Sequence, residues 1–242
     1  MHSKPSLDSA RGKVAIIIPA WNEGAVLGPV LSEVMRVTGL PPKSFIVIDD
    51  GSTDDTFDVA RRSGATVIHH LLASGGAGGP TVTGLAYAKA HNFSYVVTMD
   101  ADGQHAASDV AKLVEEIQKD NYDLIIGSRL LDSAGMPWYR LLGNQGLSFI
   151  THVLFGIGVT DSQSGLRALS KTALERLEIR SSGYEFCSEM LWRAKQQNLR
   201  VHEIAVQAIY TEYSIAKGQS NWNGIHIVKN LIKRKALELL SA

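Results

Sequence analysis

Two carboxylates end an apolar run between residues 95 and 105, which reads YVVTMDADGQH. Asp100 and Asp102 point the same way on an extended chain, and the small Ala101 between them lets a ligand approach the backbone. Like charges about 5 Å apart repel by on the order of 3 kcal/mol at an effective dielectric near 20. A divalent cation would offset that repulsion, and such hard oxygen ligands suit Mg2+ or Mn2+ sharing substrate phosphates. The alternative is a solvated turn in which Asp102 caps a helix.

Other polar side chains follow three further apolar runs of strand length. If these runs are neighbouring strands of one parallel sheet, their carboxyl ends meet at one edge and form a single cleft. Asp50 stands out because a carboxylate at a strand end can hydrogen-bond a ribose or a base, although it could also merely close the strand. The side chains expected at the cleft are Trp21, Asn22 and Glu23, then Asp49, Asp50 and Ser52, then Asp100, Asp102 and Gln104, and finally Ser128 and Arg129.

The first half of the chain alternates short runs rich in Val and Ile with longer segments of helical pattern. Most of the runs are apolar on both faces, as strands covered by helices on both sides should be. This succession predicts an α/β fold with a mostly parallel central sheet and helices on both faces. The run that contains His69 and His70 is the exception and is expected at an edge. The predicted strands are 14–19, 45–50, 66–70, 95–100 and 123–129, and the predicted helices are 25–37, 53–63, 80–91 and 108–119.

The alternation breaks after Arg129. No internal repeat and no linker-like stretch interrupts the remainder, so we expect a flexible segment over 1–12 and one domain over 13–242. The elements predicted in the second half are helices over 138–155 and 184–197, a strand over 200–210 and a final helix over 225–240.

The composition of the 242-residue chain narrows the classes of protein that it can be. With 45% hydrophobic and 20% charged residues it is typical of soluble globular domains. Because 24 Lys and Arg balance 24 Asp and Glu, overall charge gives no argument for nucleic acid as a partner. Cys187 is the single cysteine, expected as a buried structural thiol. No apolar run reaches the ~18 residues of a membrane span, and no signal peptide is apparent, so a cytoplasmic protein is expected.

Five stretches of this sequence, in order and spacing, resemble the family 2 inverting glycosyltransferases of the GT-A (nucleotide-diphospho-sugar transferase) fold. Within that family the chain is most similar to dolichyl-phosphate mannose synthase and the bacterial polyprenyl-phosphate glycosyltransferases. The resemblance implies a nucleotide-sugar half over about 13–129 and an acceptor half over about 130–242. The stretches are VAIIIPAWNEG, IVIDDGSTDDT, VVTMDADGQH, LIIGSR and VTDSQSGLRAL.

The resemblance implies roles for individual residues. The donor would be GDP-mannose or a UDP-hexose, and the acceptor a polyprenyl or dolichyl phosphate, or alternatively a sugar hydroxyl of a glycan. Mg2+ or Mn2+ would be held by Asp100, Asp102 and Gln104, Arg129 would meet a phosphate, and transfer would invert the anomeric carbon. The nucleobase and ribose would be held by Pro19, Ala20, Trp21, Glu23, Ile48 and Asp50.

Asp161, in VTDSQSGLRAL, is the candidate base or acceptor-positioning residue; it could equally be a turn carboxylate. Asp102, Arg129 and Asp161 are therefore the residues expected to act in catalysis. A lipid phosphate is already anionic and needs no base, whereas a hydroxyl acceptor does.

The sequence departs from the family pattern in two places. The stretch LLASGGAGGPTVTG lacks the usual Asn-x-Gly turn, yet Gly79 and its neighbours could still cradle phosphate through backbone amides at the start of a helix; a flexible turn is the alternative. After the last strand, Tyr213 and Lys217 stand where many relatives place an Arg, and we expect them in a mobile lid.

Contact with a membrane surface and two rival functions remain to be weighed. The helix over 138–155 carries a polar stripe opposite apolar residues that could face lipid or core, and the final helix could lie on a membrane.

A haloacid-dehalogenase-like phosphatase also has Asp-x-Asp-Gly after a strand, but on its first strand rather than its fourth. A nicotinamide dehydrogenase would need GxGxxG after the first strand, which here ends in PAWNEG.

Overall fold

The structure is a computed structural model that describes residues 13–133, 136, 138–181, 183, 185–209 and 229. Three predictions lie outside these residues: the flexible segment over 1–12, the lid with Tyr213 and Lys217, and, apart from Lys229, the final helix over 225–240.

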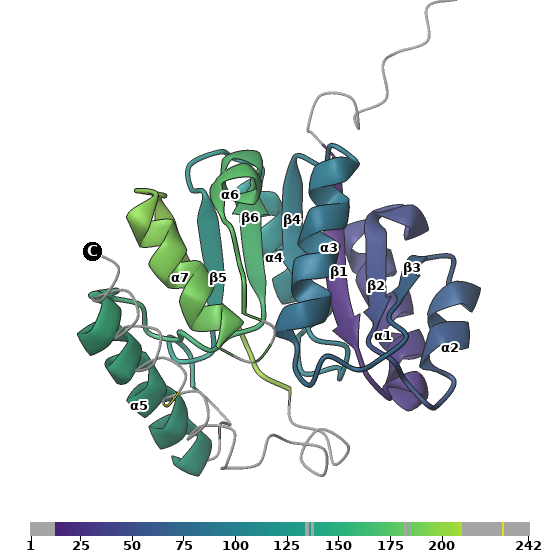
Figure 1. The fold of residues 1–242 in the computed structure, drawn as a ribbon, viewed down its shortest axis with the longest axis horizontal. Helices are drawn as coiled ribbons and strands as arrows, with labels where there is room; N and C mark the ends of the chain where they lie inside the picture. Colours follow the sequence, from purple (N-terminus) through teal and green to yellow (C-terminus); the bar gives the residue numbers. More distant parts are fainter. Residues whose placement is uncertain are drawn as a thin grey trace, which may run out of the picture.

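The described residues form one seven-stranded sheet in the order β3-β2-β1-β4-β6-β5-β7 (Figure 1). All neighbouring strands pair in parallel except those that contact β6. The predicted α/β fold with a mostly parallel sheet is therefore confirmed, and the strand with His69 lies at the edge, as expected. The strands are β1 (Val14–Ala20), β2 (Phe45–Asp49), β3 (Thr66–His69), β4 (Tyr95–Thr98), β5 (Leu124–Ser128), β6 (Arg167–Ser170) and β7 (Val201–Ala205).

The strand β6 was not predicted from the sequence. It runs antiparallel between β4 and β5, with Val97 opposite Ala168 and Ile125 opposite the same residue. Its four residues, RALS, contain no Val or Ile run and begin with an arginine, so neither strand propensity nor apolar pattern marks them. Tertiary pairing on both sides decides their conformation.

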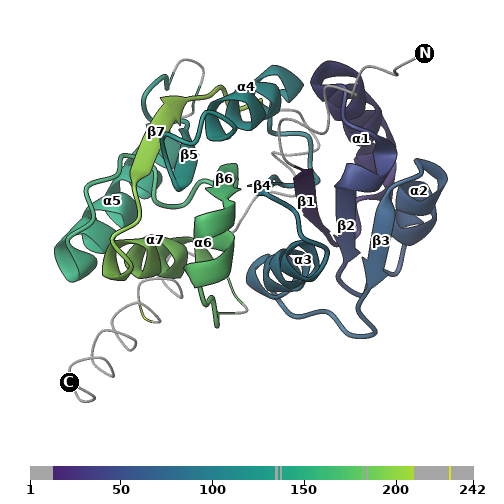
Figure 2. The same cartoon turned by 90° about the horizontal axis from the view of Figure 1, so that it is seen from above.

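Helices cover both faces of the sheet, as predicted. α1, α2 and α4 lie on one face and α3, α6 and α7 on the other, while α5 lies beyond the β5–β7 side (Figure 2). Alternate strand residues feed two cores: Ile16 and Ile18 pack with α1 and α4, whereas Ile17 packs with α3. The helices are α1 (Gly24–Thr38), α2 (Thr56–Arg62), α3 (Gly78–Ala90), α4 (Ala107–Ile117), α5 (Trp138–Phe155), α6 (Lys171–Arg176) and α7 (Phe186–Gln196), with a 3-10 turn at Pro42–Ser44.

The chain reverses direction across the sheet between β1 and β4, and this reversal places the site. From β1 it moves outward to β2 and β3, then returns to lay β4 on the other side of β1. Loops after two such strands separate at their carboxyl ends and leave a crevice there. The carboxyl end of β1 leads to Trp21 and that of β4 to Asp100, so both candidate ligand-binding turns open at this crevice.

The helix predicted over 53–63 begins only at Thr56, because the preceding residues bond to the turn after β1. The hydroxyl of Ser52 accepts from the backbone N–H of Asn22 at 2.9 Å, and Asp54 accepts from the N–H of Gly24 at 3.0 Å. These contacts tie the turns after β1 and β2 together at the carboxyl edge of the sheet.

The carboxylate of Asp123, just before β5, links β5 to β6 and β7 at the end of the sheet opposite β3. It accepts from the backbone N–H and the guanidinium of Arg200, which precedes β7, and from the hydroxyl of Ser170 in β6. These hydrogen bonds, with the Arg200 charge, hold the pKa of Asp123 below its ordinary value although burial opposes them.

We expect Asp123 to contribute stability that is lost in acid. Because its folded-state pKa is lowered, the contribution is complete above the unfolded value of about 4 and disappears as pH falls through the folded one. Urea unfolding of the wild type and Asp123→Asn should therefore show a stability difference at pH 7 that shrinks below pH ~4. A difference that stays constant down to pH ~2 would contradict this.

The single thiol and the surface complete the fold. Cys187 is buried in α7, where desolvation raises its pKa to about 11, so the expected structural thiol is confirmed.

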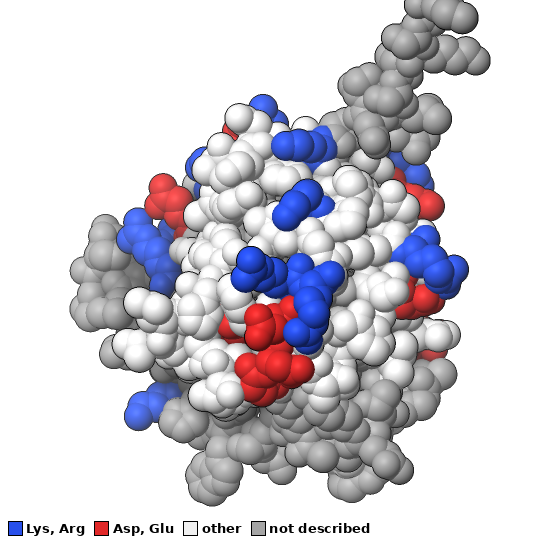
Figure 3. Space-filling model, turned by 90° about the vertical axis from the view of Figure 1, so that its right-hand side faces the viewer, with Lys and Arg blue, Asp and Glu red and all other residues white. Residues whose placement is uncertain are grey.

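The face over β3 and α2 carries basic and acidic side chains interspersed among neutral ones (Figure 3). Within the described part of the chain, no helix combines the length and apolar character needed to span a bilayer.

Candidate active site

The turn after β4 holds the two carboxylates that the sequence singled out. Both oxygens of Asp102 bond to Gln104: Oδ1 accepts from its backbone N–H at 2.9 Å and Oδ2 from its side-chain amide at 2.7 Å. The intervening Gly103 takes φ = 77°, a left-handed conformation that allows the turn to close. Asp102 and Gln104 therefore lie together, with Ala101 buried between the two aspartates.

Electrostatics at this turn fit a bound cation. Burial, and then the negative charge of Asp100, raises the pKa of Asp102. Within the described residues, no three His, Cys, Asp or Glu side chains converge as a complete metal cluster. The predicted set is instead two carboxylates and an amide, and ions such as Mg2+ take their remaining ligands from water and substrate phosphates. Hard oxygen donors of this kind match that chemistry.

Asp100 is held on two sides. The imidazole Nε2 of His105 lies 3.0 Å from its Oδ2. On the other side is Gly165, where an added Cβ would stand 2.7 and 2.8 Å from the two carboxylate oxygens. Burial alone would raise the pKa of Asp100, but the hydrogen bond from His105 and two nearby arginines hold it below its ordinary value. The carboxylate thus stays charged between His105 and Gly165, with its side chain 44% exposed.

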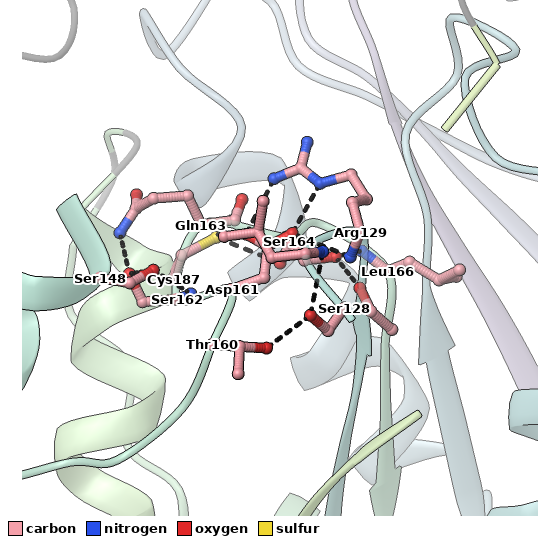
Figure 4. Close-up of polar contacts among 12 residues, drawn as sticks. Ser128, Arg129, Ser148, Thr160, Asp161, Ser162, Gln163, Ser164, Leu166 and Cys187 are labelled. Carbon is pink, nitrogen blue, oxygen red and sulfur yellow. Dashed lines mark hydrogen bonds and ion pairs between the residues drawn. The ribbon is translucent and has the colours of Figure 1, made fainter. Parts of the chain in front are cut away.

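Arg129, directly after β5, forms a two-pronged ion pair with Asp161. Its Nε and Nη2 donate to the two oxygens of Asp161 at 2.7 and 3.0 Å, and its backbone N–H donates to Oδ2 at 3.2 Å (Figure 4). Burial would raise the pKa of Asp161, but the Arg129 charge and hydrogen bonds outweigh it and keep that pKa low. The pair brings together two of the predicted catalytic residues and fixes the guanidinium at the strand end.

Glu203 on β7 fixes the loop that carries Asp161, a role that the sequence did not reveal. Its carboxylate accepts from the backbone N–H groups of Thr160 and Asp161, and from the Thr160 hydroxyl at 2.9 Å. That hydroxyl also lies 2.6 Å from the hydroxyl of Ser128 at the end of β5. Contacts from β5 and β7 therefore hold the loop that places Asp161 against Arg129.

Buried polar contacts anchor the loop after Asp161. Several of them are made by Arg167, the largest of the fully buried side chains among the described residues. The guanidinium of Arg167 donates to the backbone carbonyls of Ser162, Ser164 and Cys187 at 2.7 to 2.9 Å. Hydroxyl and amide groups of α5, this loop and α7 bond around Ser162 (Figure 4). This loop belongs to VTDSQSGLRAL, one of the five stretches that resemble the family. Nothing in the sequence indicated that its arginine is buried.

On the donor side, Asp50 is buried and its carboxylate is already engaged. Oδ1 lies 2.7 Å from Nδ1 of His70, and Oδ2 accepts from the N–H and hydroxyl of Ser74, both at 2.8 Å. The other ring nitrogen of His70 contacts Thr83 of α3 at 3.0 Å. The loop over 71–77, where the sequence departs from the family, thus folds onto the carboxylate predicted to bind ribose or base.

The remaining predicted donor residues fall into two groups. Trp21 is 52% exposed and Pro19 is half-buried, whereas Ala20 and Glu23 are buried at the crevice wall. The side chain of Ile48 lies in the core beneath α3, so its predicted contact with a nucleobase or ribose would have to be made by its backbone. Gly79 lies in the first turn of α3, where backbone N–H groups have no partner within the helix.

The carboxylate turn after β4 and the arginine after β5 follow strands that run in the same direction and end at the same edge of the α/β sheet. The sequence matches the family described as glycosyl transferase family 2 over residues 15–178. This chain belongs to that family and is a glycosyltransferase, which removes the phosphatase and dehydrogenase alternatives.

Two curated relatives act on lipid-linked acceptors by name. The chain is 37% identical over 249 residues to a UDP-N-acetylglucosamine–dolichyl-phosphate N-acetylglucosaminyltransferase of Methanococcus voltae, covering 94% of this chain and 98% of that protein. It is 28% identical to the polyprenol monophosphomannose synthase of Mycolicibacterium smegmatis, covering 85% and 80%. The predicted similarity to polyprenyl-phosphate glycosyltransferases is therefore confirmed.

Among solved structures, glucosyl-3-phosphoglycerate synthase of Mycobacterium tuberculosis superimposes with a TM-score of 0.72 at 21% identity, covering 97% of this chain and 86% of that one. That enzyme has also been solved with Mn2+ and UDP-glucose. The likeness establishes the GT-A fold, confirming the predicted architecture.

Proposed function

We propose that this protein transfers a sugar from a nucleotide-diphospho-sugar to a polyprenyl phosphate, with inversion at the anomeric carbon. The observation that carries the proposal is the Arg129–Asp161 pair. A buried carboxylate with a lowered pKa and both oxygens bound to a guanidinium is a poor general base. The same pair presents a fixed positive group at the strand end, which suits a phosphate acceptor or donor better than a neutral hydroxyl.

The proposed chemistry then follows from the side chains. An oxygen of the lipid phosphate, already anionic, attacks the anomeric carbon, and the bond from that carbon to the diphosphate breaks on the opposite face. The nucleoside diphosphate leaves with the electron pair, so no proton has to be removed. Arg129 stabilises phosphate charge as it develops, and Asp161 orients Arg129 rather than acting as a base.

Asp100, Asp102 and Gln104 would hold Mg2+ or Mn2+ at the donor diphosphate. A bound cation of this kind supplies Lewis-acid stabilisation of the leaving group. Trp21, Glu23 and Asp50 line the wall where the base and ribose would lie, and the first turn of α3 with Gly79 offers N–H groups to a phosphate. GDP-mannose and UDP-hexoses are the donors that we propose, with UDP-sugars favoured by the Methanococcus relative.

We also propose peripheral contact with the membrane through α5. On this helix Ser148 and Thr151 bond inward to Ser162, which follows Asp161. The opposite side carries apolar side chains that are about half to two-thirds exposed at helical spacing: Tyr139, Leu142, Phe149 and Val153. A polyprenyl phosphate keeps its tail in the bilayer, so a lipid-facing helix beside the acceptor loop would bring the headgroup to the site.

Transfer in vitro tests the proposal. Full-length protein, Mn2+ or Mg2+ and vesicles containing polyprenyl phosphate should convert one labelled donor from a panel of GDP-mannose, UDP-glucose and UDP-N-acetylglucosamine into extractable sugar-lipid, and the protein should sediment with the vesicles. EDTA and Asp102→Ala should reduce turnover at least ~100-fold, whereas Asp58→Asn on the surface of α2 should not.

Two results would revise the proposal. Transfer to a soluble sugar and not to the lipid phosphate would favour the hydroxyl-acceptor alternative. Full turnover in EDTA, or with Asp102→Ala, would exclude the proposed metal-dependent mechanism.

A further inference from the structure

His105 has no role in the function proposed so far, yet it lies against the centre of the site. His105 is only 7% exposed, and its Nε2 lies 3.0 Å from Oδ2 of Asp100. A buried imidazole needs a hydrogen-bond partner, and a charged carboxylate can only accept. The proton of this contact must therefore be on Nε2, and His105 is the donor.

We propose that His105 is a positioning residue for the metal: by binding Oδ2 of Asp100 it fixes that carboxylate with Oδ1 available to a cation shared with Asp102 and Gln104. The inference rests on the proposed metal-dependent function. Hydrogen-bonded partners of metal-binding carboxylates orient the ligand and remove the freedom that it would otherwise lose on binding.

The backbone around His105 is itself held in place. His105 forms an antiparallel bridge with Ala208, and the carbonyl of Gln104 accepts from the N–H of Ile209 at 2.9 Å. Gln207 donates its N–H to the buried carboxylate of Asp109 at the start of α4, at 2.8 Å. The chain that leaves β7 thus braces the metal turn, so the imidazole is presented from a fixed main chain.

Gly165 closes the other side of Asp100. A Cβ at this position would overlap both carboxylate oxygens, so the Asp100 side chain packs directly on the glycine backbone. The carbonyl of Gly165 accepts from the hydroxyl of Thr98 at 2.7 Å, which anchors this wall to β4. The Gly165 backbone on one side and the His105 donor on the other orient the Asp100 carboxylate, while its side chain stays 44% exposed on the side left open.

Mn2+ binding measured by EPR, in the presence of UDP and separately of GDP, tests this role. His105→Leu fills the space but cannot donate, and we expect it to weaken Mn2+ binding roughly 10- to 100-fold. His105→Gln places an amide donor at similar reach and should restore most of the affinity. The matched control is His91→Leu, because His91 is exposed at the end of α3, with β4 between it and Asp100 in the chain. Among the contacts described, its ring bonds to the carbonyl of Tyr87 and stacks on the Tyr87 ring.

Each outcome separates the role of His105 from the proposed function. If the wild type binds Mn2+, Asp102→Ala does not, and His105→Leu binds as tightly as the wild type, the positioning role is wrong while the metal site stands. If the wild type binds no Mn2+ with either nucleotide, the metal site is wrong and this inference falls with it. Equal losses in His105→Leu and His105→Gln would also contradict a role as hydrogen-bond donor.

A measurement on the unaltered protein guards against a variant that fails to fold. In wild-type protein labelled with 15N-histidine, the His105 Nε2 should carry a proton, and adding Mg2+ with nucleotide should shift that resonance. An unprotonated Nε2 would overturn the proposal. The melting temperature of each variant, measured alongside, shows whether lost metal affinity reflects the site or the fold.

Discussion

Gly165→Ala is expected to reduce sugar transfer by about 100-fold while the protein remains folded. The new methyl group would stand within 2.8 Å of both oxygens of Asp100, so this carboxylate must rotate or the loop must shift. A displacement of about 1 Å at a reacting site can cost ~100-fold in rate. Gly165 does not have a positive φ, so alanine fits its backbone and the expected loss of stability is only about 1 to 2 kcal/mol.

Steady-state kinetics and Mn2+ affinity, with a melting curve for each protein, check this expectation. Gly158→Ala is the matched control, because a Cβ at Gly158 meets no atom within 4 Å. Weaker Mn2+ binding together with lower kcat would show that Asp100 has moved from the metal. Normal transfer and normal Mn2+ affinity would contradict both the packing of Asp100 on Gly165 and its proposed role as a ligand.

The elements around the donor side could be predicted because their signals are local. Runs such as VAIIIPA and FIVID are buried on both faces, which only strands covered by helices on both sides require. In α4, apolar residues at helical spacing, Val110, Leu113, Val114 and Ile117, are all buried. The carboxyl ends of such strands meet at one edge, so the position of Asp100 and Arg129 at the same edge of the sheet followed from the pattern.

The acceptor side resisted prediction because its structure depends on contacts between distant residues. Strand β6 exists through pairing with β4 and β5, and Glu203 bonds to Thr160 across 43 positions. For Ile48 the resemblance implied a ligand contact without saying which atoms make it, and folding places the side chain in the core and leaves the backbone for that role. A sequence gives the order of residues, whereas these roles depend on which side chains meet after folding.

The contacts of the buried His105 and Arg167 could not be predicted from the sequence for a related reason. Polar residues in a sequence are normally expected at the surface, since burying them costs free energy unless every polar atom finds a partner. Here the partners are a carboxylate five positions away for His105 and three backbone carbonyls for Arg167. Polar residues beside a predicted site are therefore candidates for buried, fully bonded roles rather than solvated turns.

Arg167 gives the largest expected effect on stability. Arg167→Met should lower the free energy of unfolding by about 3 to 5 kcal/mol, because it removes three charge-assisted hydrogen bonds and leaves the carbonyls of Ser162, Ser164 and Cys187 buried without their donor. The loop that carries Asp161 should loosen as well, because two of those carbonyls belong to it.

Urea unfolding followed by fluorescence measures the effect, with Arg176→Met at the exposed end of α6 as the control, expected within about 0.5 kcal/mol of the wild type. Arg167→Lys keeps the positive charge but not the planar fork that reaches three carbonyls, so its stability should lie between those of Arg167→Met and the wild type. A loss below about 1 kcal/mol for Arg167→Met would show that the loop is held by its hydroxyl contacts instead, and that the buried guanidinium is dispensable.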